Sequence, residues 1–164
     1  MDHELSGFNK AIALLKRLHF KVVKEDVSRP WGGFYVIDEM QAAQFAKEFF
    51  PEENFEKLKI AGKLSPKLLI IAPNKRLSWQ YHHRRAEVWK CIDGEVEVVT
   101  SFTNEEKNKC RLKAGDKIKL MQGERHRLTG LHKWAIIAEI WQHTDAANPS
   151  NEDDIVRLQD DFGR

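Results

Sequence analysis

Four residues between positions 80 and 126 have side chains that can bind a metal ion: Gln80, His82, Glu87 and His126. One amide oxygen, two imidazoles and one carboxylate form a ligand set of intermediate hardness. Such a set suits Zn²⁺, Mn²⁺, Fe²⁺ or Ni²⁺ better than Ca²⁺ and leaves coordination positions open for substrate oxygens. A hydrogen-bonded polar core without metal is the alternative interpretation. The presence of four such groups at matched spacing favours the metal site.

The local pattern places three of these side chains on neighbouring strands. Residues 77–82 have strand character, and because side chains alternate along a strand, Gln80 and His82 are expected on one face. A turn at residues 84 and 85 would return the chain as a second strand, paired with the first, that presents Glu87 to the same face. The sequence therefore predicts a metal-binding face on two paired strands.

Two further residues are candidates for general acid–base chemistry. Glu139 lies between Ala138 and Ile140 in an apolar strand, where a carboxylate is costly unless it is paired or used. His83 is the second candidate. It directly follows His82 and should point to the opposite face, so a surface role is its alternative interpretation.

Three arginines are candidates for binding an anionic group such as a phosphate. Arg127 follows His126 directly, and a guanidinium matches the geometry of phosphate oxygens. Arg29 and Arg85 are weaker candidates of the same kind. A surface arginine is the competing interpretation for each of them.

The elements that must position these residues belong mainly to a β-rich half. From Lys67 onward, short segments rich in Val, Ile, Trp and Thr alternate with turn-forming residues at intervals of about 8 to 12 residues, as in a small barrel or sandwich. Asp93-Gly94 is typical of a hairpin that ends one strand. Hydrophobic periodicity and capping residues predict the remaining elements, which are helices at 6–19 and 41–50, strands at 20–24 and 33–37, and a short helix within 151–160.

Composition limits the classes of protein to which the chain can belong. It has 164 residues, of which 41% are hydrophobic and 32% charged, as in a globular protein with one core. The longest apolar run, 68–72, is far shorter than the roughly 18 residues that span a membrane, and the N-terminus does not look like a signal peptide. A net charge of +2 gives no reason to expect a nucleic-acid or membrane partner. These observations predict a cytoplasmic protein whose two cysteines, Cys91 and Cys110, are reduced.

The spacing of the ligand candidates resembles the two cupin motifs. The first motif is matched by Gln80-x-His82, followed after four residues by Glu87 and after six more by Gly94. Gln80 takes the place of the first histidine of that motif. The second motif is matched by Gly115, followed after five residues by Met121-x-Gly123 and after two more by His126. Met121 stands where the family usually has proline. The resemblance implies an all-β core, the cupin double-stranded β-helix or jelly roll, with N-terminal helical decoration. Residues 1–64 would pack on a barrel formed by 65–164, within one structural domain.

A narrower resemblance points to the type II mannose-6-phosphate isomerases. It rests on the segments RPWG (29–32), LSWQYHH (77–83), RAEVW (85–89), GERHRL (123–128), EDDIVR (152–157) and FGR (162–164). It covers residues 28–37 and about 65–164, and it leaves the segment 38–64 outside the common pattern. The family usually has histidines at the positions of Arg84 and Val88.

This resemblance implies a metal-dependent aldose–ketose isomerase that interconverts mannose 6-phosphate and fructose 6-phosphate through an enediolate. One divalent metal ion, zinc as the first expectation and Mn, Fe or Ni as alternatives, would hold the sugar oxygens at Gln80, His82, Glu87 and His126. Glu139 or His83 would carry the proton. The arginines would fix the phosphate, and the barrel could pair into a homodimer, as cupins commonly do.

Two alternatives remain open from the sequence. The absence of histidines at Arg84 and Val88 is compatible with a sugar-binding cupin that has no catalytic activity. A different metal-dependent cupin enzyme, either an iron-dependent oxygenase or an isomerase of a heptose phosphate, is the second alternative.

Overall fold

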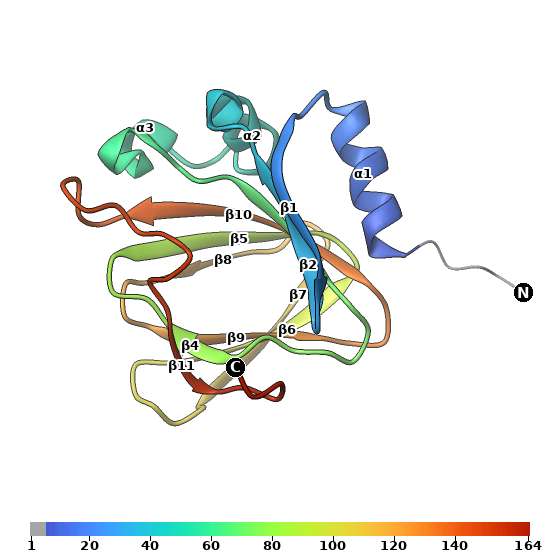
Figure 1. The fold of residues 1–164 in the computed structure, drawn as a ribbon, viewed down its shortest axis with the longest axis vertical. Coiled ribbons are helices and arrows are strands. Elements are labelled where there is room, and N and C mark those ends of the chain that lie inside the picture. The colour runs from blue at the N-terminus through green and yellow to red at the C-terminus, as the bar shows by residue number, and fades with distance from the viewer. Residues whose placement is uncertain (1–5) are drawn as a thin grey trace, which may run out of the picture.

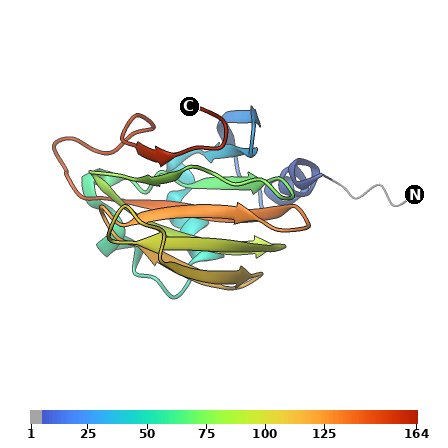
Figure 2. The same cartoon turned by 90° about the horizontal axis from the view of Figure 1, so that it is seen from below.

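Two antiparallel sheets face each other across an apolar interior, and helices cover the outer face of the larger sheet (Figure 1). The structure is a computed structural model that describes residues 6–164. The larger sheet contains, in spatial order, β1 (Val22–Arg29), β2 (Gly32–Ile37), β3 (Lys67–Ile71), β10 (Ala135–His143), β5 (Arg85–Asp93) and β8 (Lys117–Leu120). The smaller sheet contains β11 (Val156–Gln159), β4 (Trp79–Tyr81), β9 (Arg125–Gly130), β6 (Glu95–Ser101) and β7 (Asn108–Lys113), which lie side by side in Figure 2. This arrangement is the jelly roll that the sequence predicts.

The helical layer comes from the N-terminal part of the chain. It consists of α1 (Gly7–Arg17), a 3₁₀ turn η1 (Glu39–Gln41), α2 (Ala42–Phe49), α3 (Phe55–Leu58) and a second 3₁₀ turn η2 (Ile60–Gly62). Ser6 caps α1 by accepting a hydrogen bond from the backbone N–H of Asn9. The two predicted N-terminal helices are confirmed as α1 and α2, and η1 directly precedes the second. None of the helices among residues 6–164 is long and apolar enough to cross a membrane.

Strand β10 lies at the centre of the larger sheet and is buried on both faces. Ile136, Ala138 and Ile140 face the helical layer, and Ile137 faces the other sheet. Alternation puts Glu139 on the same face as Ile137, so its carboxylate points into the interior of the barrel. The position of this strand therefore places a carboxylate inside the barrel.

Two sequence predictions about strand pairing are wrong. Strands β4 and β5 belong to different sheets, so Gln80 and Glu87 approach from opposite walls of the barrel rather than from paired strands. Asp93 and Gly94 likewise do not form a hairpin, because β5 and β6 also lie in different sheets. Gly94, with a φ of +75°, instead makes the corner at which the chain passes from one sheet to the other.

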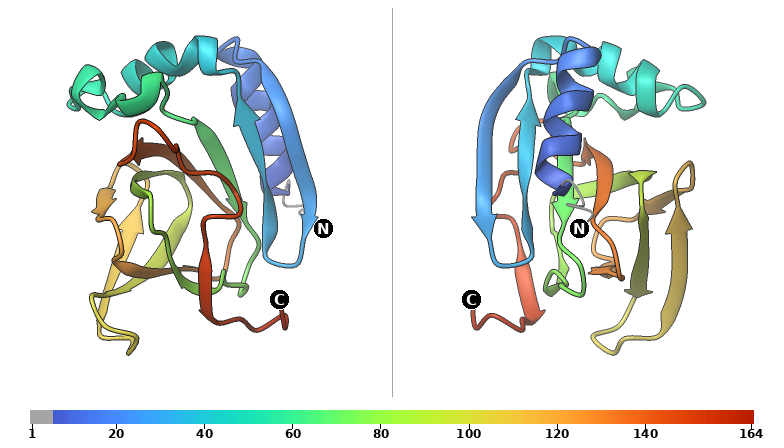
Figure 3. Two further views of the ribbon diagram at one scale, coloured as in Figure 1. Left: turned by 60° about the vertical axis from the view of Figure 1, so that its left-hand side comes forward. Right: turned by 90° about the vertical axis from the view of Figure 1, so that its right-hand side faces the viewer.

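The predicted C-terminal helix is also wrong, since the end of the chain forms strand β11. This strand pairs with β4, and Arg157 lies opposite Gln80. Residues 144–155, which we call the C-terminal strap, run from the end of β10 to β11 across the open side between the two sheets (Figure 3). Pairing with the exposed edge of β4 satisfies the backbone of this segment better than an isolated short helix could.

Candidate metal centre and substrate cavity

Three side chains converge between the two sheets with one potential metal ligand each. One ligand atom from each of His82, Glu87 and His126 lies within 4.8 Å of the other two. The Nε2 atom of His82 is 3.2 Å from Oε1 of Glu87, and the Nε2 atom of His126 is 3.7 Å from Oε2 of the same carboxylate. All three side chains are buried. The structure thus brings together three of the four predicted metal ligands in a closed cluster.

The backbone explains how residues so far apart in sequence meet. Glu87 points inward from β5 in the larger sheet, whereas His126 points inward from β9 in the smaller one. His82 follows the last residue of β4, and Gln80 on that strand lies in register with His126. The site therefore depends on the packing of one sheet on the other.

Both imidazoles are oriented by hydrogen bonds from their Nδ1 atoms. His82 Nδ1 donates to the main-chain oxygen of Asp154 at 2.7 Å, and His126 Nδ1 donates to that of Glu124 at 3.2 Å. The Nε2 atom of each ring is then the one that faces Glu87. Such outer partners fix the tautomer and the ring orientation of metal-binding histidines.

The chemistry of the cluster fits a divalent metal ion. Among the described residues Oε2 of Glu87 has no hydrogen-bond partner although it is fully buried, so a strong acceptor faces the interior unsatisfied. Burial opposes the ionisation of Glu87, but His82 and Arg85 outweigh it and hold its pKa well below the ordinary value. Burial lowers the pKa of His126 to about 4, so this ring is neutral at pH 7, as a ligand must be.

Gln80 lies beside the cluster with its amide nitrogen toward it. Its Nε2 atom is 3.4 Å from Nε2 of His126, and its Oε1 atom accepts a hydrogen bond from the Ser78 hydroxyl at 2.7 Å. A 180° rotation of the amide would present Oε1 to the cluster, and the Ser78 hydroxyl could then accept a hydrogen bond from the amide nitrogen. Gln80 thus lies close enough to His126 for its amide to be a candidate fourth ligand.

Arg85 lies at the metal cluster rather than at a distant anion site. Its Nε atom donates to Oε1 of Glu87 at 2.8 Å, and its Nη2 atom is 3.3 Å from Nε2 of His82. The guanidinium stacks 3.7 Å from the ring centroid of Trp141. Because Arg85 contacts Glu87 and His82, its charge acts on the ligand cluster.

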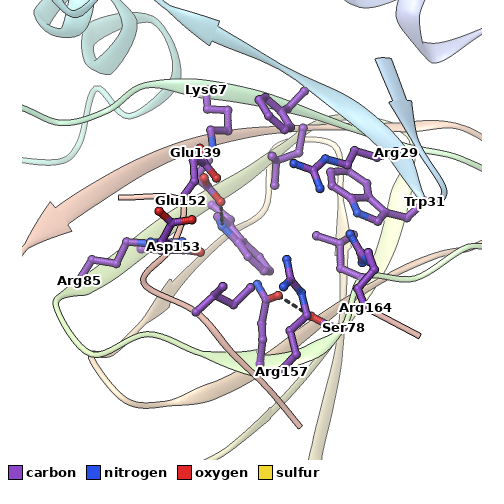
Figure 4. A pocket seen from close by; sticks show the side chains of 17 residues that line it. Arg29, Trp31, Lys67, Ser78, Arg85, Glu139, Glu152, Asp153, Arg157 and Arg164 are labelled. Carbon is purple, nitrogen blue, oxygen red and sulfur yellow. Dashed lines mark hydrogen bonds and ion pairs between the residues drawn. The ribbon is translucent and has the colours of Figure 1, made fainter. Parts of the chain in front are cut away.

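Glu87 of this cluster lines a cavity of about 480 Å³, whose lining side chains are drawn in Figure 4. Gln80, Arg85 and Glu87 line it, whereas the two buried histidines are not among its lining residues. Glu139, the carboxylate that the sequence analysis identifies as a candidate base, also lines the cavity. The cavity therefore joins the metal cluster to a second buried acid.

Glu139 is held between two indole rings. Its Oε2 atom accepts a hydrogen bond from Trp89 Nε1 and its Oε1 atom accepts one from Trp141 Nε1, both at 2.7 Å. Burial, reinforced by the negative charge of Glu87, raises the pKa of Glu139 to about 7. A carboxylate with this pKa can exchange a proton near neutral pH.

Lys67 is a cavity residue that the sequence analysis missed. It lies directly opposite Glu139 in the pairing of β3 with β10, and its Nζ atom is 2.6 Å from Oε1 of Glu152 on the strap. The lysine is buried and lies over the ring of Trp141 at 4.8 Å. A lysine at the start of an apolar run was the available signal, but it does not by itself indicate which residues face it.

The far end of the cavity is basic. Arg29, Arg157 and Arg164 line it on the side away from Lys67 and Glu139 (Figure 4). Burial lowers the pKa of Arg157, and the like charges of Arg164 and Arg29 lower it further. Arg157 forms no ion pair with the described residues, whereas Arg29 pairs with Asp26. Of the predicted anion-binding arginines, the structure thus places only Arg29 at this end, and it adds two from the C-terminal segment.

Two predicted site residues lie outside the cavity lining. Arg127 points to the opposite side of β9 from His126, where its guanidinium donates to the main-chain oxygen of Leu77 and pairs with Glu106. His83 is exposed and packs against the Tyr81 ring. Neither side chain is positioned to touch a molecule in the cavity, because each belongs to the outward-facing set of its segment.

Arg84 and Val88, which stand where the family usually has histidines, also lie outside the cavity lining. Val88 is buried in the cluster between the larger sheet and the helices. Arg84 contacts the strap through a hydrogen bond from its Nε atom to the main-chain oxygen of Asn148 at 3.2 Å. These two replacements therefore leave the cavity lining intact.

Comparison with known proteins places the chain in a family. Residues 40–160 match the family described as mannose-6-phosphate isomerase C-terminal. The match includes most of the segment 38–64 that the sequence analysis had left outside the common pattern, so that exclusion was wrong. Alginate biosynthesis protein AlgA of Pseudomonas aeruginosa is 29% identical over 139 residues, which are 85% of this chain and 23% of that protein. Xanthan biosynthesis protein XanB of Xanthomonas campestris is 26% identical over an alignment of 134 residues that covers 76% of this chain and 25% of that protein.

Solved structures share the fold at low sequence identity. Recombinant oxalate oxidase in complex with glycolate superposes with a TM-score of 0.56 at 19% identity, over 86% of this chain and 64% of that one. An oxalate decarboxylase formate complex from Lactobacillus farciminis gives 0.55 at 16% identity, over 82% of this chain and 33% of that one. The chain spans about a quarter of the length of the curated relatives it matches. With its two-sheet jelly roll and this family match, the chain belongs to the mannose-6-phosphate isomerase C-terminal family of cupins.

Proposed function

We propose that the protein is a metal-dependent aldose–ketose isomerase acting on a sugar phosphate, with mannose 6-phosphate and fructose 6-phosphate as the first substrate pair. The observation that carries the proposal is one cavity with a metal-ligand cluster beside a carboxylate of pKa about 7. Membership of the isomerase family supports the same activity.

The reacting end of the sugar would lie between Glu87 and Glu139. When bound by His82, Glu87 and His126, with Gln80 as fourth ligand, a divalent ion supplies Lewis-acid stabilisation of negative charge on the sugar oxygens. Zinc suits this donor set, with manganese, iron and nickel as alternatives. Glu139 would accept the proton from C2 and return it to C1 while the two indole N–H groups keep its carboxylate in place.

The other end of the substrate would be fixed by its phosphate. Arg29, Arg157 and Arg164 form a positive group at the far side of the cavity, and guanidinium groups bind phosphate oxygens in pairs. Anchoring the phosphate there orients C1 and C2 toward Glu139, which lowers the entropy cost of the proton transfer. Arg85, near the ligand cluster, would instead stabilise charge on the reacting oxygens.

The test is turnover by metal-loaded protein in heavy water. With mannose 6-phosphate, proton NMR should show fructose 6-phosphate, and solvent deuterium should enter at C1 of the product. Glu139→Gln should retain metal and lose most of this exchange, because an amide cannot accept the proton.

Binding without exchange would overturn the isomerase proposal. If the metal-loaded protein binds hexose and heptose phosphates but exchanges no proton at C2 of either, the sugar-binding cupin becomes the better description. Oxygen uptake on adding a sugar substrate to the iron-loaded protein would instead indicate an oxygenase.

A further inference from the structure

We propose that Asp154, on the C-terminal strap, is a positioning residue that fixes the metal ligand His82 and thereby sets the metal affinity of the site. The inference rests on the metal centre of the proposed function. It concerns a residue that lies outside both the ligand set and the cavity lining.

Three hydrogen bonds join Asp154 to the segment that carries His82. Its main-chain oxygen accepts from His82 Nδ1 at 2.7 Å. Its carboxylate accepts from the backbone N–H groups of His83 and Arg84, both at 2.9 Å. The residue is only 4% exposed. One residue thus binds the ligand ring and the two peptide groups that follow it.

A hydroxyl links this arrangement to the arginine at the cluster. Ser150 Oγ donates to Oδ2 of Asp154 at 2.7 Å and accepts from Arg85 Nη1 at 2.9 Å. Arg85 Nη1 also donates to the main-chain oxygen of Asn151 at 3.1 Å. The strap therefore orients both His82 and the guanidinium that touches Glu87.

A carboxylate is required at position 154 for a geometric reason. Its two oxygens face two backbone N–H groups and one hydroxyl, all of which act as donors here. An amide of the same shape would direct an NH₂ group at one of these donors. The turn after β4 would then shift, and the Nε2 atom of His82 would move away from Glu87.

Because the strap and the metal both bind His82, docking of the strap and binding of the metal must be linked. A metal ion that holds Nε2 of His82 also favours the ring orientation in which Nδ1 reaches Asp154. Thermodynamic linkage then requires that metal binding stabilise the docked strap to the extent that docking strengthens metal binding.

The experiment measures metal affinity rather than activity. Asp154→Asn should bind Co²⁺ about 10- to 100-fold more weakly in titration calorimetry, the range found for outer partners of metal ligands, and should change the visible absorption of the Co²⁺ complex. Ser150→Ala provides a second, smaller change that should weaken binding in the same direction.

Asp161→Asn is the matched control. Asp161 anchors the same C-terminal segment through two hydrogen bonds from Arg76, away from the ligand cluster. This variant should lower the melting temperature while keeping Co²⁺ affinity within about twofold. The inference would be overturned if Asp154→Asn and Ser150→Ala bound Co²⁺ as tightly as the wild type. It would also be overturned if Asp154→Asn and Asp161→Asn lost Co²⁺ affinity equally.

Hydrogen exchange supplies the reciprocal measurement. Metal should slow amide exchange in residues 144–155 of the wild type and have no such effect in His82→Ala. If wild type binds metal and Asp154→Asn is weakened but neither shows isomerisation, the positioning role stands and the isomerase proposal fails. If the wild type binds no metal, both the positioning role and the isomerase proposal fail. If the wild type is an active isomerase but Asp154→Asn and Ser150→Ala bind metal as tightly as it does, only the positioning role is overturned.

Discussion

His126 and Arg127 are consecutive residues of β9 whose side chains leave the strand on opposite faces. The His126 ring lies edge-to-face against Trp89, with 5.3 Å between centroids, and reaches Glu87 in the barrel interior. The Arg127 guanidinium is buried on the other side, against Leu77 and the C-terminal segment. Because two neighbours on a regular strand point to opposite faces, Arg127 lies outside the cavity lining, and we expect a structural role for it.

Arg127→Ala should lower the free energy of unfolding by about 2 kcal/mol or more, because buried acceptors such as the Leu77 carbonyl lose their donor. Denaturant unfolding measures this loss. The ratio of affinities for phosphorylated and unphosphorylated sugar should stay unchanged. A selective loss of the phosphorylated ligand would contradict the structural role.

Metal binding should distinguish two adjacent histidines. His82→Ala should lower the metal content of purified protein sharply, since one of the three clustered ligands is lost. His83→Ala should keep full metal content, because its ring is exposed beside Tyr81. Elemental analysis of the two variants, prepared identically, measures the difference. Equal content in both would show that the ligand assignment is wrong.

The rate of isomerisation should rise with pH through a pKa near 7. Glu139 must be ionised to accept a proton, and burial together with Glu87 raises its pKa to about 7. A profile of kcat/KM against pH therefore reports this group on its acidic limb. Glu139→Gln should lower kcat by about 10²- to 10⁴-fold at pH 8. A wild-type profile that is flat from pH 5 to 8 would rule out Glu139 as the base.

The same carboxylate should influence stability in a predictable direction. A pKa raised in the folded state means that Glu139 favours folding most below its unfolded pKa near 4.5, and that this contribution is lost as the pH rises through 7. In chelator-treated protein, the melting temperature of Glu139→Gln relative to wild type should therefore increase from pH 5 to pH 8. The loss of one indole hydrogen bond adds a constant offset, so only the trend is informative. An unchanged difference would mean that Glu139 titrates normally.

The basic end of the cavity should select for phosphate. Arg157→Ala should weaken binding of a sugar phosphate at least about tenfold, because a charge-assisted contact is lost, and should leave binding of the unphosphorylated sugar nearly unchanged. Calorimetry with both ligands gives the comparison. Arg76 pairs with Asp161 and does not line the cavity, so Arg76→Ala is the control. It should change neither the affinity for the sugar phosphate nor that for the unphosphorylated sugar. If Arg157→Ala weakens binding of both sugars equally, the phosphate does not bind at Arg157.

The sequence by itself determined the features that depend on local pattern. The strand rhythm after Lys67 indicated a β-barrel, because alternation and turn residues are properties of short segments. The spacing around His82, Glu87 and His126 identified three groups that the structure brings together. Glu139 was found because a carboxylate in an apolar strand is costly wherever that strand packs.

Only the tertiary structure decided which distant segments meet. Glu87 and Gln80 lie on opposing sheets, so the predicted pairing of their strands was wrong, although both side chains line one cavity. The residues that close the cavity, Lys67 and Arg157, come from segments whose partners lie far away in the chain. Pairing of β11 with β4 also overrode the helical preference of the tail. Local propensity is worth less than about 1 kcal/mol per residue, whereas edge pairing, burial and ion pairs act across the whole fold and are not encoded in any short window.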